Sequence, residues 1–182
     1  IPNHKKLREG DIINLDITVI KDGYHGDTSA MFIVGETTPL RRQLCKVAQE
    51  SLYAAIKQVR PGMCITEIGA LIQPIVEKAG FSVVRDYCGH GIGSEFHEEP
   101  QILHYRNGGK QELKPGMCFT IEPMVNSKKY HCRINPKDGW TVTTKDGGDS
   151  AQWEHTLLVT EDGCEVLTLR PDDTIDRVIK HS

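Results

Sequence analysis

Residues 12–34 read IINLDITVIKDGYHGDTSAMFIV, and the architecture can be worked out from this stretch. Polar and apolar side chains alternate over residues 12–20, and this period of two predicts a β-strand with one polar and one apolar face. Asp22-Gly23 is the strongest short signal for a hairpin turn, so residues 24–34 are expected to return as a second, antiparallel strand. The stretch therefore predicts a β-hairpin.

Two acids of this hairpin are expected to share one face. With the turn placed at the Asp-Gly pair, Asp16 lies opposite Ser29 and Asp27 lies opposite Thr18. Diagonal neighbours of this kind are roughly 7–8 Å apart at the backbone. The carboxylates of Asp16 and Asp27 can therefore reach the same ligand.

Two helices and further strands are expected after the hairpin. Thr38 is a plausible N-cap, and an apolar stripe at helical spacing continues from Leu40 to Val59. A second helix is expected to start near Thr66 and to end at Gly80. Further strands are expected at 81–85, 117–122, 140–144, 152–160 and 164–169. The glycine-rich stretch after the first of these is expected to be a loop.

The composition is that of one globular domain covering residues 1–182, with 38% hydrophobic and 26% charged residues. The net charge of -3 gives no electrostatic reason to expect sequence-specific nucleic acid or an anionic membrane as a partner. No apolar run approaches the roughly 20 residues that cross a bilayer. Six scattered cysteines without a C-x-x-C pair predict free thiols in a reducing, cytoplasmic compartment.

Five residues in distinctive local sequences are the candidate metal ligands: Asp16, Asp27, His90, Glu122 and Glu154. They supply four carboxylates and one imidazole, a ligand set that suits a pair of hard or borderline divalent cations. A structural zinc site would show cysteine pairs at short spacing instead. Divalent cations acidify a bound water and so create a nucleophile near neutral pH.

Each candidate also has an ordinary explanation. Asp16 and Asp27 alone could be solvated acids on a half-exposed strand. Glu122 and Glu154 adjoin apolar strand segments, where a buried charge needs a partner. Jointly the set is far more specific, because four acids directed to one interior need cations. His97 fits the same site, although it could equally be a surface residue among its acidic neighbours.

The local sequences around these residues resemble those of type I methionine aminopeptidases, especially the bacterial ones. The matching stretches are residues 10–16, 23–28, 87–93, 96–100, 119–124, 138–141 and 150–156. The resemblance implies an α+β, pita-bread (creatinase/aminopeptidase) fold, with a curved antiparallel sheet, flanking helices and a dinuclear centre in a cleft. The short spacing between His97 and Glu122 favours type I over type II, which carries a long helical insertion in the second half.

The resemblance also implies how the five ligands are shared. Asp16 binds one metal ion, His90 and Glu122 bind the other, and Asp27 and Glu154 bridge both. Four carboxylates then balance the charge of two divalent ions. Mn²⁺, Fe²⁺, Co²⁺ and Zn²⁺ all suit this set, and their availability decides among them.

Catalytic and substrate-binding roles follow from the same resemblance. Glu122 is expected to act as the general base, and His97 to stabilise the tetrahedral intermediate. Phe96 and Trp140 are expected to line the methionine side-chain pocket, although either could be ordinary core. Thr18 completes the expected substrate-binding set together with His97.

The implied activity is removal of the N-terminal methionine from nascent polypeptides when the second residue is small. The implied partners are nascent chain N-termini, with the ribosome as a further partner, and the implied state is a monomer. Prolidase and aminopeptidase P share the fold and ligand set and are the alternative enzymes. A second alternative is a catalytically impaired module that only binds metal or other proteins.

The start of the chain differs from that of the family. Family members carry additional sequence, including a histidine in a His-Gly pair, before the position of Ile1-Pro2. The first half of the fold is therefore expected to be incomplete. We expect the chain alone to turn over substrate poorly.

Overall fold

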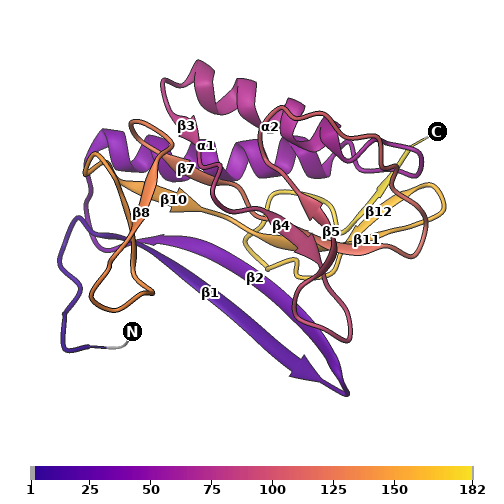
Figure 1. The fold of residues 1–182 in the computed structure, drawn as a ribbon, viewed down its shortest axis with the longest axis horizontal. Helices are drawn as coiled ribbons and strands as arrows, with labels where there is room; N and C mark the ends of the chain where they lie inside the picture. The colour runs from indigo at the N-terminus through magenta and orange to yellow at the C-terminus, as the bar shows by residue number, and fades with distance from the viewer. Residues whose placement is uncertain (1–2, 182) are drawn as a thin grey trace.

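The structure is a computed structural model that describes residues 3–181, and the expectation for Ile1-Pro2 lies outside this range. Two helices, α1 (Pro39–Ile56) and α2 (Thr66–Lys78), lie side by side over antiparallel sheets. Figure 1 shows a long hairpin on the side of the sheets away from the helices. No helix within the described range is both long and apolar enough to cross a membrane.

The long hairpin is formed by β1 (Ile12–Lys21) and β2 (Tyr24–Ile33), as the alternation pattern predicts. The two turn residues Asp22 and Gly23 have φ values of 52° and 84°. Left-handed conformations at both central positions match the right-handed twist of the flanking strands. The register is the expected one, with Asp16 opposite Ser29 and Thr18 opposite Asp27.

The first helix begins where the capping signal predicts, because the Thr38 side chain accepts a hydrogen bond from the Arg41 N–H. The predicted apolar stripe is wrong at its start, since Leu40 is 48% exposed. Leu40 lies in the first turn of α1, before the buried face begins at Leu44. The second helix continues through Pro74, and Gly80 follows it with a positive φ.

The larger sheets lie between the helices and the hairpin. The six-stranded sheet has the order β13 (Val178–Lys180), β12 (Gly163–Val166), β11 (His155–Val159), β6 (Cys118–Ile121), β4 (Gly89–Gly91) and β5 (Glu98–Ile102). The three-stranded sheet has the order β10 (Ser150–Gln152), β7 (Met124–Asn126) and β3 (Ser82–Val83). A separate hairpin pairs β8 (Cys132–Ile134) with β9 (Val142–Thr144).

The glycine-rich stretch around His90 forms strand β4, which lies between β6 and the edge strand β5 of the six-stranded sheet, so the predicted loop is wrong. The glycines permit close approach of the neighbouring backbones. A Cβ atom on Gly89 would lie 2.4 Å from the Thr120 carbonyl oxygen, and one on Gly91 would lie 2.2 Å from that of Glu99. Glycine is therefore needed at these two positions because the backbones of β6 and β5 lie too close for a side chain.

The predicted strand at 152–160 is interrupted, because the chain changes sheets at Trp153 and Glu154. Strand β10 pairs with β7 before this point, and β11 pairs with β6 after it. Glu154 therefore does not lie within a strand as predicted. It forms a β-bridge to Ser29 on β2 instead.

The core fills the space between the two helices and the sheets. Fully buried side chains from both layers include Leu44, Leu52, Ile56, Ile68, Ile72, Phe119, Ile121 and Leu157. All six cysteines are free thiols, as the sequence predicts, and Cys45 and Cys164 are buried. The fold therefore needs no disulfide to close its core.

Candidate metal centre

The hairpin contributes two acids, and Asp27 is the more buried of them, at 4% exposure. Thr18 donates a hydrogen bond to Asp27 Oδ1 at 2.8 Å, and Thr156 donates to the Asp27 carbonyl oxygen at 2.7 Å. Burial, followed by the charge of Asp27, raises the pKa of Asp16. Asp16 is exposed on β1, and its carboxyl group interacts electrostatically with that of Asp27, in keeping with the diagonal register of β1 and β2.

His90 is oriented by its backbone and by one ring nitrogen. Its N–H donates to Thr120 Oγ1 at 3.0 Å, and its Nδ1 lies 2.9 Å from the Gly91 carbonyl oxygen. A carbonyl can only accept, so Nδ1 carries a proton, and Nε2 is the ring nitrogen whose lone pair is available to a cation when the imidazole is neutral. That Nε2 lies 3.7 Å from Asp27 Oδ2 and 3.5 Å from Glu122 Oε1.

Glu122 follows the end of β6 and is held from three sides. Thr120 donates to Glu122 Oε1 at 2.7 Å, and Gln152 Nε2 lies 3.2 Å from Oε2 and donates to it. The Glu122 N–H donates to His104 Nε2 at 3.1 Å. Burial lowers the pKa of His104 to about 3, so this ring is neutral and able to accept.

Glu154 is the most deeply buried acid of the cluster, at 1% exposure. Both of its carboxylate oxygens lack a hydrogen-bond partner among the described residues. Donor atoms of Asp27, His90 and Glu154 lie within 4.8 Å of one another. A buried carboxylate without a partner is costly, and a cation bound by these residues removes that cost.

Electrostatics support the same conclusion. Burial, followed by the charges of Glu122, Asp27 and Asp16, raises the pKa of Glu154 to about 10. Burial also raises the pKa of Glu122 to about 7, against the hydrogen bond from Thr120. The protein on its own keeps protons among these acids, and divalent cations can replace those protons.

His97 and Phe96 lie beside this cluster. The His97 ring centroid is 4.3 Å from that of His90, and the Phe96 ring stacks on His97 at 4.0 Å. Burial, followed by the charge of His90, lowers the pKa of His97. Phe96 is 37% exposed, and its other stacking partner is His25 at 5.8 Å.

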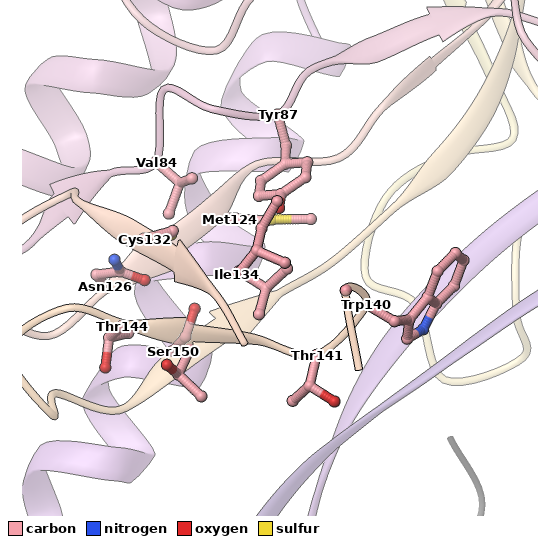
Figure 2. Close-up of a pocket in the computed structure, with 13 residues that line it drawn as sticks. Val84, Tyr87, Met124, Asn126, Cys132, Ile134, Trp140, Thr141, Thr144 and Ser150 are labelled. Atoms are coloured by element: carbon pink, nitrogen blue, oxygen red, sulfur yellow. The ribbon is translucent and has the colours of Figure 1, made fainter. Parts of the chain in front are cut away.

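Trp140 does not join these residues in the structure. It is 73% exposed and lies in the segment between β8 and β9. It lines a cavity of 660 Å³ together with Tyr87, Met124 and Ile134. Figure 2 shows the Trp140 ring pointing away from Met124 and Ile134. None of these residues lines the 340 Å³ cavity that contains His90 and His97.

Sequence reasoning missed three residues that hold the ligands in place: Thr120, His104 and Gln152. Thr120 and Gln152 each lie two residues before a candidate ligand, so a period-two strand pattern could have found them. His104 reaches Glu122 from the segment after β5, and no local pattern marks it.

Comparison with known proteins identifies the class that this fold and site define. Residues 1–161 match the model of metallopeptidase family M24. The chain is 61% identical over its whole length to the methionine aminopeptidase of Escherichia coli K12 and spans 69% of that protein. The chain belongs to metallopeptidase family M24 and has the expected pita-bread fold.

Solved structures agree with this assignment. The methionine aminopeptidase of Rickettsia prowazekii has a TM-score of 0.90 and 51% identity, with 93% of this chain and 68% of that chain covered. The prolidase of Pyrococcus furiosus has a TM-score of 0.71 and 26% identity, with 91% of this chain but 43% of the prolidase covered. Similarity is therefore greater to the methionine enzymes.

Proposed function

We propose that this chain is a metallo-exopeptidase that removes the N-terminal methionine of polypeptides whose second residue is small. The single observation that carries the proposal is the cluster of Asp27, His90 and Glu154, whose donor atoms lie within 4.8 Å of one another. Glu122 adjoins this cluster 3.5 Å from His90, and the charge of Asp27 raises the pKa of Asp16 beside it. The 61% identity to a methionine aminopeptidase over the full chain supports methionine as the residue removed.

The proposed ligand roles are those that the family resemblance implies. Asp16 would hold one cation, His90 and Glu122 would hold the other, and Asp27 and Glu154 would serve both. When bound, the cations polarise the scissile carbonyl and acidify water. The orphaned oxygens of Glu154, and the position of His90 Nε2 between Asp27 and Glu122, support a shared cation site.

The proposed catalytic residues are Glu122 and His97. Hydrogen bonds from Thr120 and Gln152 fix both oxygens of the Glu122 carboxylate, so it is oriented to accept a proton and to pass it to the leaving amine. A neutral His97 can donate a hydrogen bond to the oxygen that becomes negative. The lowered pKa of His97 favours this neutral form.

Phe96, Thr18 and Trp140 are the proposed substrate-binding residues, together with His97. Phe96 and Thr18 lie beside the candidate ligands, because Phe96 contacts the His90 ring edge at 5.7 Å and Thr18 hydrogen-bonds Asp27. Trp140 is proposed on the family resemblance alone, since its ring lies apart from them.

A peptide assay tests the proposed function. Met-Ala-Ser should be cleaved far faster than Met-Leu-Ser, because a tight second subsite excludes a large side chain. Gly-Pro should remain intact, whereas a proline-specific peptidase would cleave it. Both outcomes are scored with Mn²⁺ or Co²⁺ added and again after chelation. Equal rates on the two methionine peptides, or cleavage of Gly-Pro alone, would refute the proposal.

We further propose that the chain acts in the cytoplasm as a single-domain monomer on nascent polypeptides at the ribosome. Free thiols at all six cysteines support a reducing compartment. Exposed basic side chains around β8 and β9 could face ribosomal RNA: Lys128, Lys129, Arg133, Lys137 and Lys145. Salt-sensitive co-sedimentation with ribosomes and a monomeric elution volume are the expected results; salt-independent sedimentation would contradict this role.

A further inference from the structure

Arg170 lies behind the candidate metal centre, in the segment between β12 and β13. Its side chain is 20% exposed, and its guanidinium carbon lies 5.3 Å from the centroid of the Trp153 ring. Trp153 directly precedes Glu154 in the chain. The guanidinium is thus packed against the segment where the chain crosses between the two sheets.

One terminal nitrogen of Arg170 connects the two segments that carry the candidate bridging acids. Nη1 donates to Thr28 Oγ1 at 2.9 Å and lies 3.3 Å from the Ser29 carbonyl oxygen. The Thr28 hydroxyl in turn donates to the Glu154 carbonyl oxygen at 2.9 Å. Thr28 directly follows Asp27, so these bonds tie the backbone beside both acids to one group.

The other terminal nitrogen is anchored in a buried network. Nη2 donates to Asp173 Oδ1 at 3.1 Å, and the Tyr53 hydroxyl donates to the same oxygen. Burial raises the pKa of Asp173, but hydrogen bonds from Tyr53 and the Arg170 N–H outweigh it and the pKa is lowered. Asp173 is therefore ionised near neutral pH, and its charge fixes the guanidinium from the side of α1.

We infer that Arg170 is a positioning residue for the metal centre, which sets the spacing of Asp27 and Glu154 and supplies a fixed positive charge behind them. This inference rests on the proposed function, in which both acids bridge the cations. A bridging carboxylate must reach two ions at once, so a small shift of either strand weakens both bonds.

A set of four variants tests this role on the full chain. Arg170→Gln removes both the charge and the planar guanidinium with its two terminal donors, whereas Arg170→Lys keeps only the charge. Thr28→Val removes the hydroxyl that joins Arg170 to Glu154. The matched control is Arg177→Gln, because Arg177 is an exposed arginine of the same segment between β12 and β13 and pairs with Glu165 at 3.7 Å. The measurements are calorimetric titration with Mn²⁺ and the visible spectrum of the Co²⁺-loaded protein.

The wild type and the Arg177→Gln control should bind two ions and give the same Co²⁺ spectrum. Arg170→Gln should weaken binding by roughly 10–100-fold, the usual effect of removing a group that orients metal ligands. Its Co²⁺ spectrum should also change. Arg170→Lys should recover part of the affinity, and Thr28→Val should shift affinity and spectrum in the same direction as Arg170→Gln.

If Arg170 only anchors the segment after β12 and does not position the metal ligands, a different result is expected. Arg170→Gln would then melt at a lower temperature but bind Mn²⁺ as the wild type does, with an unchanged Co²⁺ spectrum, and the inference would be overturned. If Arg170→Gln does not fold, unaltered binding by Thr28→Val overturns it equally. Failure of the wild type to bind any cation would instead reject the proposed function.

Discussion

Glu154 shows how a single side chain can disclose the chemistry of a site. Its carboxylate is buried without a hydrogen-bond donor among residues 3–181, and its neighbours are further acids. Sequence alone shows only an acid beside apolar residues, because burial and the lack of donors depend on three strands that meet there. The choice of the five candidate ligands was possible from the sequence, whereas the residues that orient them were not.

Substituting Glu154 by glutamine should reduce metal content more than substituting Phe96 by alanine. The proposed bridging carboxylate serves both cations, whereas Phe96 stacks on His97 and belongs to the substrate side. Phe96→Ala should mainly weaken methionine binding. Metal analysis after gel filtration checks this prediction. Equal loss of metal in the two variants would show that the roles are wrongly assigned.

Stability of the metal-free protein should decrease as the pH rises. The pKa values of Glu122 and Glu154 are raised from 4.5 to about 7 and about 10. A group with a raised pKa in the folded state stabilises most below its ordinary pKa, and this contribution is lost as the pH rises through the raised value. Each such group costs up to roughly 1.4 kcal/mol per pH unit in that range.

Urea unfolding in the presence of a chelator measures this effect. The unfolding midpoint should be lower at pH 8 than at pH 6, and Glu154→Gln should reduce the difference because the substituted side chain no longer titrates. Cation-loaded protein should show a smaller pH dependence. A midpoint that is the same at both pH values in chelator would contradict the electrostatic account of the cluster.

At the scale of elements, the hairpin was fully predictable and the strand that carries His90 was not. Alternation and an Asp-Gly turn are local features, and they fix the register of β1 and β2. Strand β4 has no such pattern, because it contains glycines at positions where the backbones of β5 and β6 leave no room for a side chain. The break between β10 and β11 could not be predicted from local sequence either, because it arises where β10 pairs with β7 and β11 pairs with β6.

Substituting Gly89 by alanine should destabilise the fold and disturb His90. The added methyl group would lie 2.4 Å from the Thr120 carbonyl oxygen, so strands β4 and β6 must separate. Overpacking of this kind costs about 1–3 kcal/mol or more. Gly108→Ala is the matched control, because no atom of the described residues lies within 4 Å of the place its methyl group would take. Chemical unfolding of both variants tests the contact, and equal stability would contradict it.

At the scale of the whole molecule, the fold class was predicted from the sequence motifs around the candidate ligands and not from the number of predicted helices and strands. Composition defined only a globular domain, and several short strands gave no clear pattern, including β8 and β13. The position of Trp140 could not be predicted, because no local pattern shows that it lines the cavity in Figure 2 together with residues of β7 and β10.

Removing the cations should lower the melting temperature. Four acids crowd the space between the hairpin and the six-stranded sheet, and ions that bind only the folded state add ligand-linked stability. Adding Mn²⁺ or Co²⁺ after chelation should restore the original melting curve. Scanning calorimetry with parallel metal analysis checks this result. An unchanged curve in protein shown to have lost its metal would refute a structural contribution.

The placement of the hairpin also determines how the molecule opens. Leu15, Ile17 and Val19 of β1 are 47%, 57% and 57% exposed, so little apolar burial holds this strand in place. Cations that tie Asp16 and Asp27 to Glu154 would act as a clasp across chain positions that are far apart in sequence. Amide hydrogens of β1 and β2 should then exchange with deuterium at rates that follow the free cation concentration, while those of α1 exchange only through global unfolding.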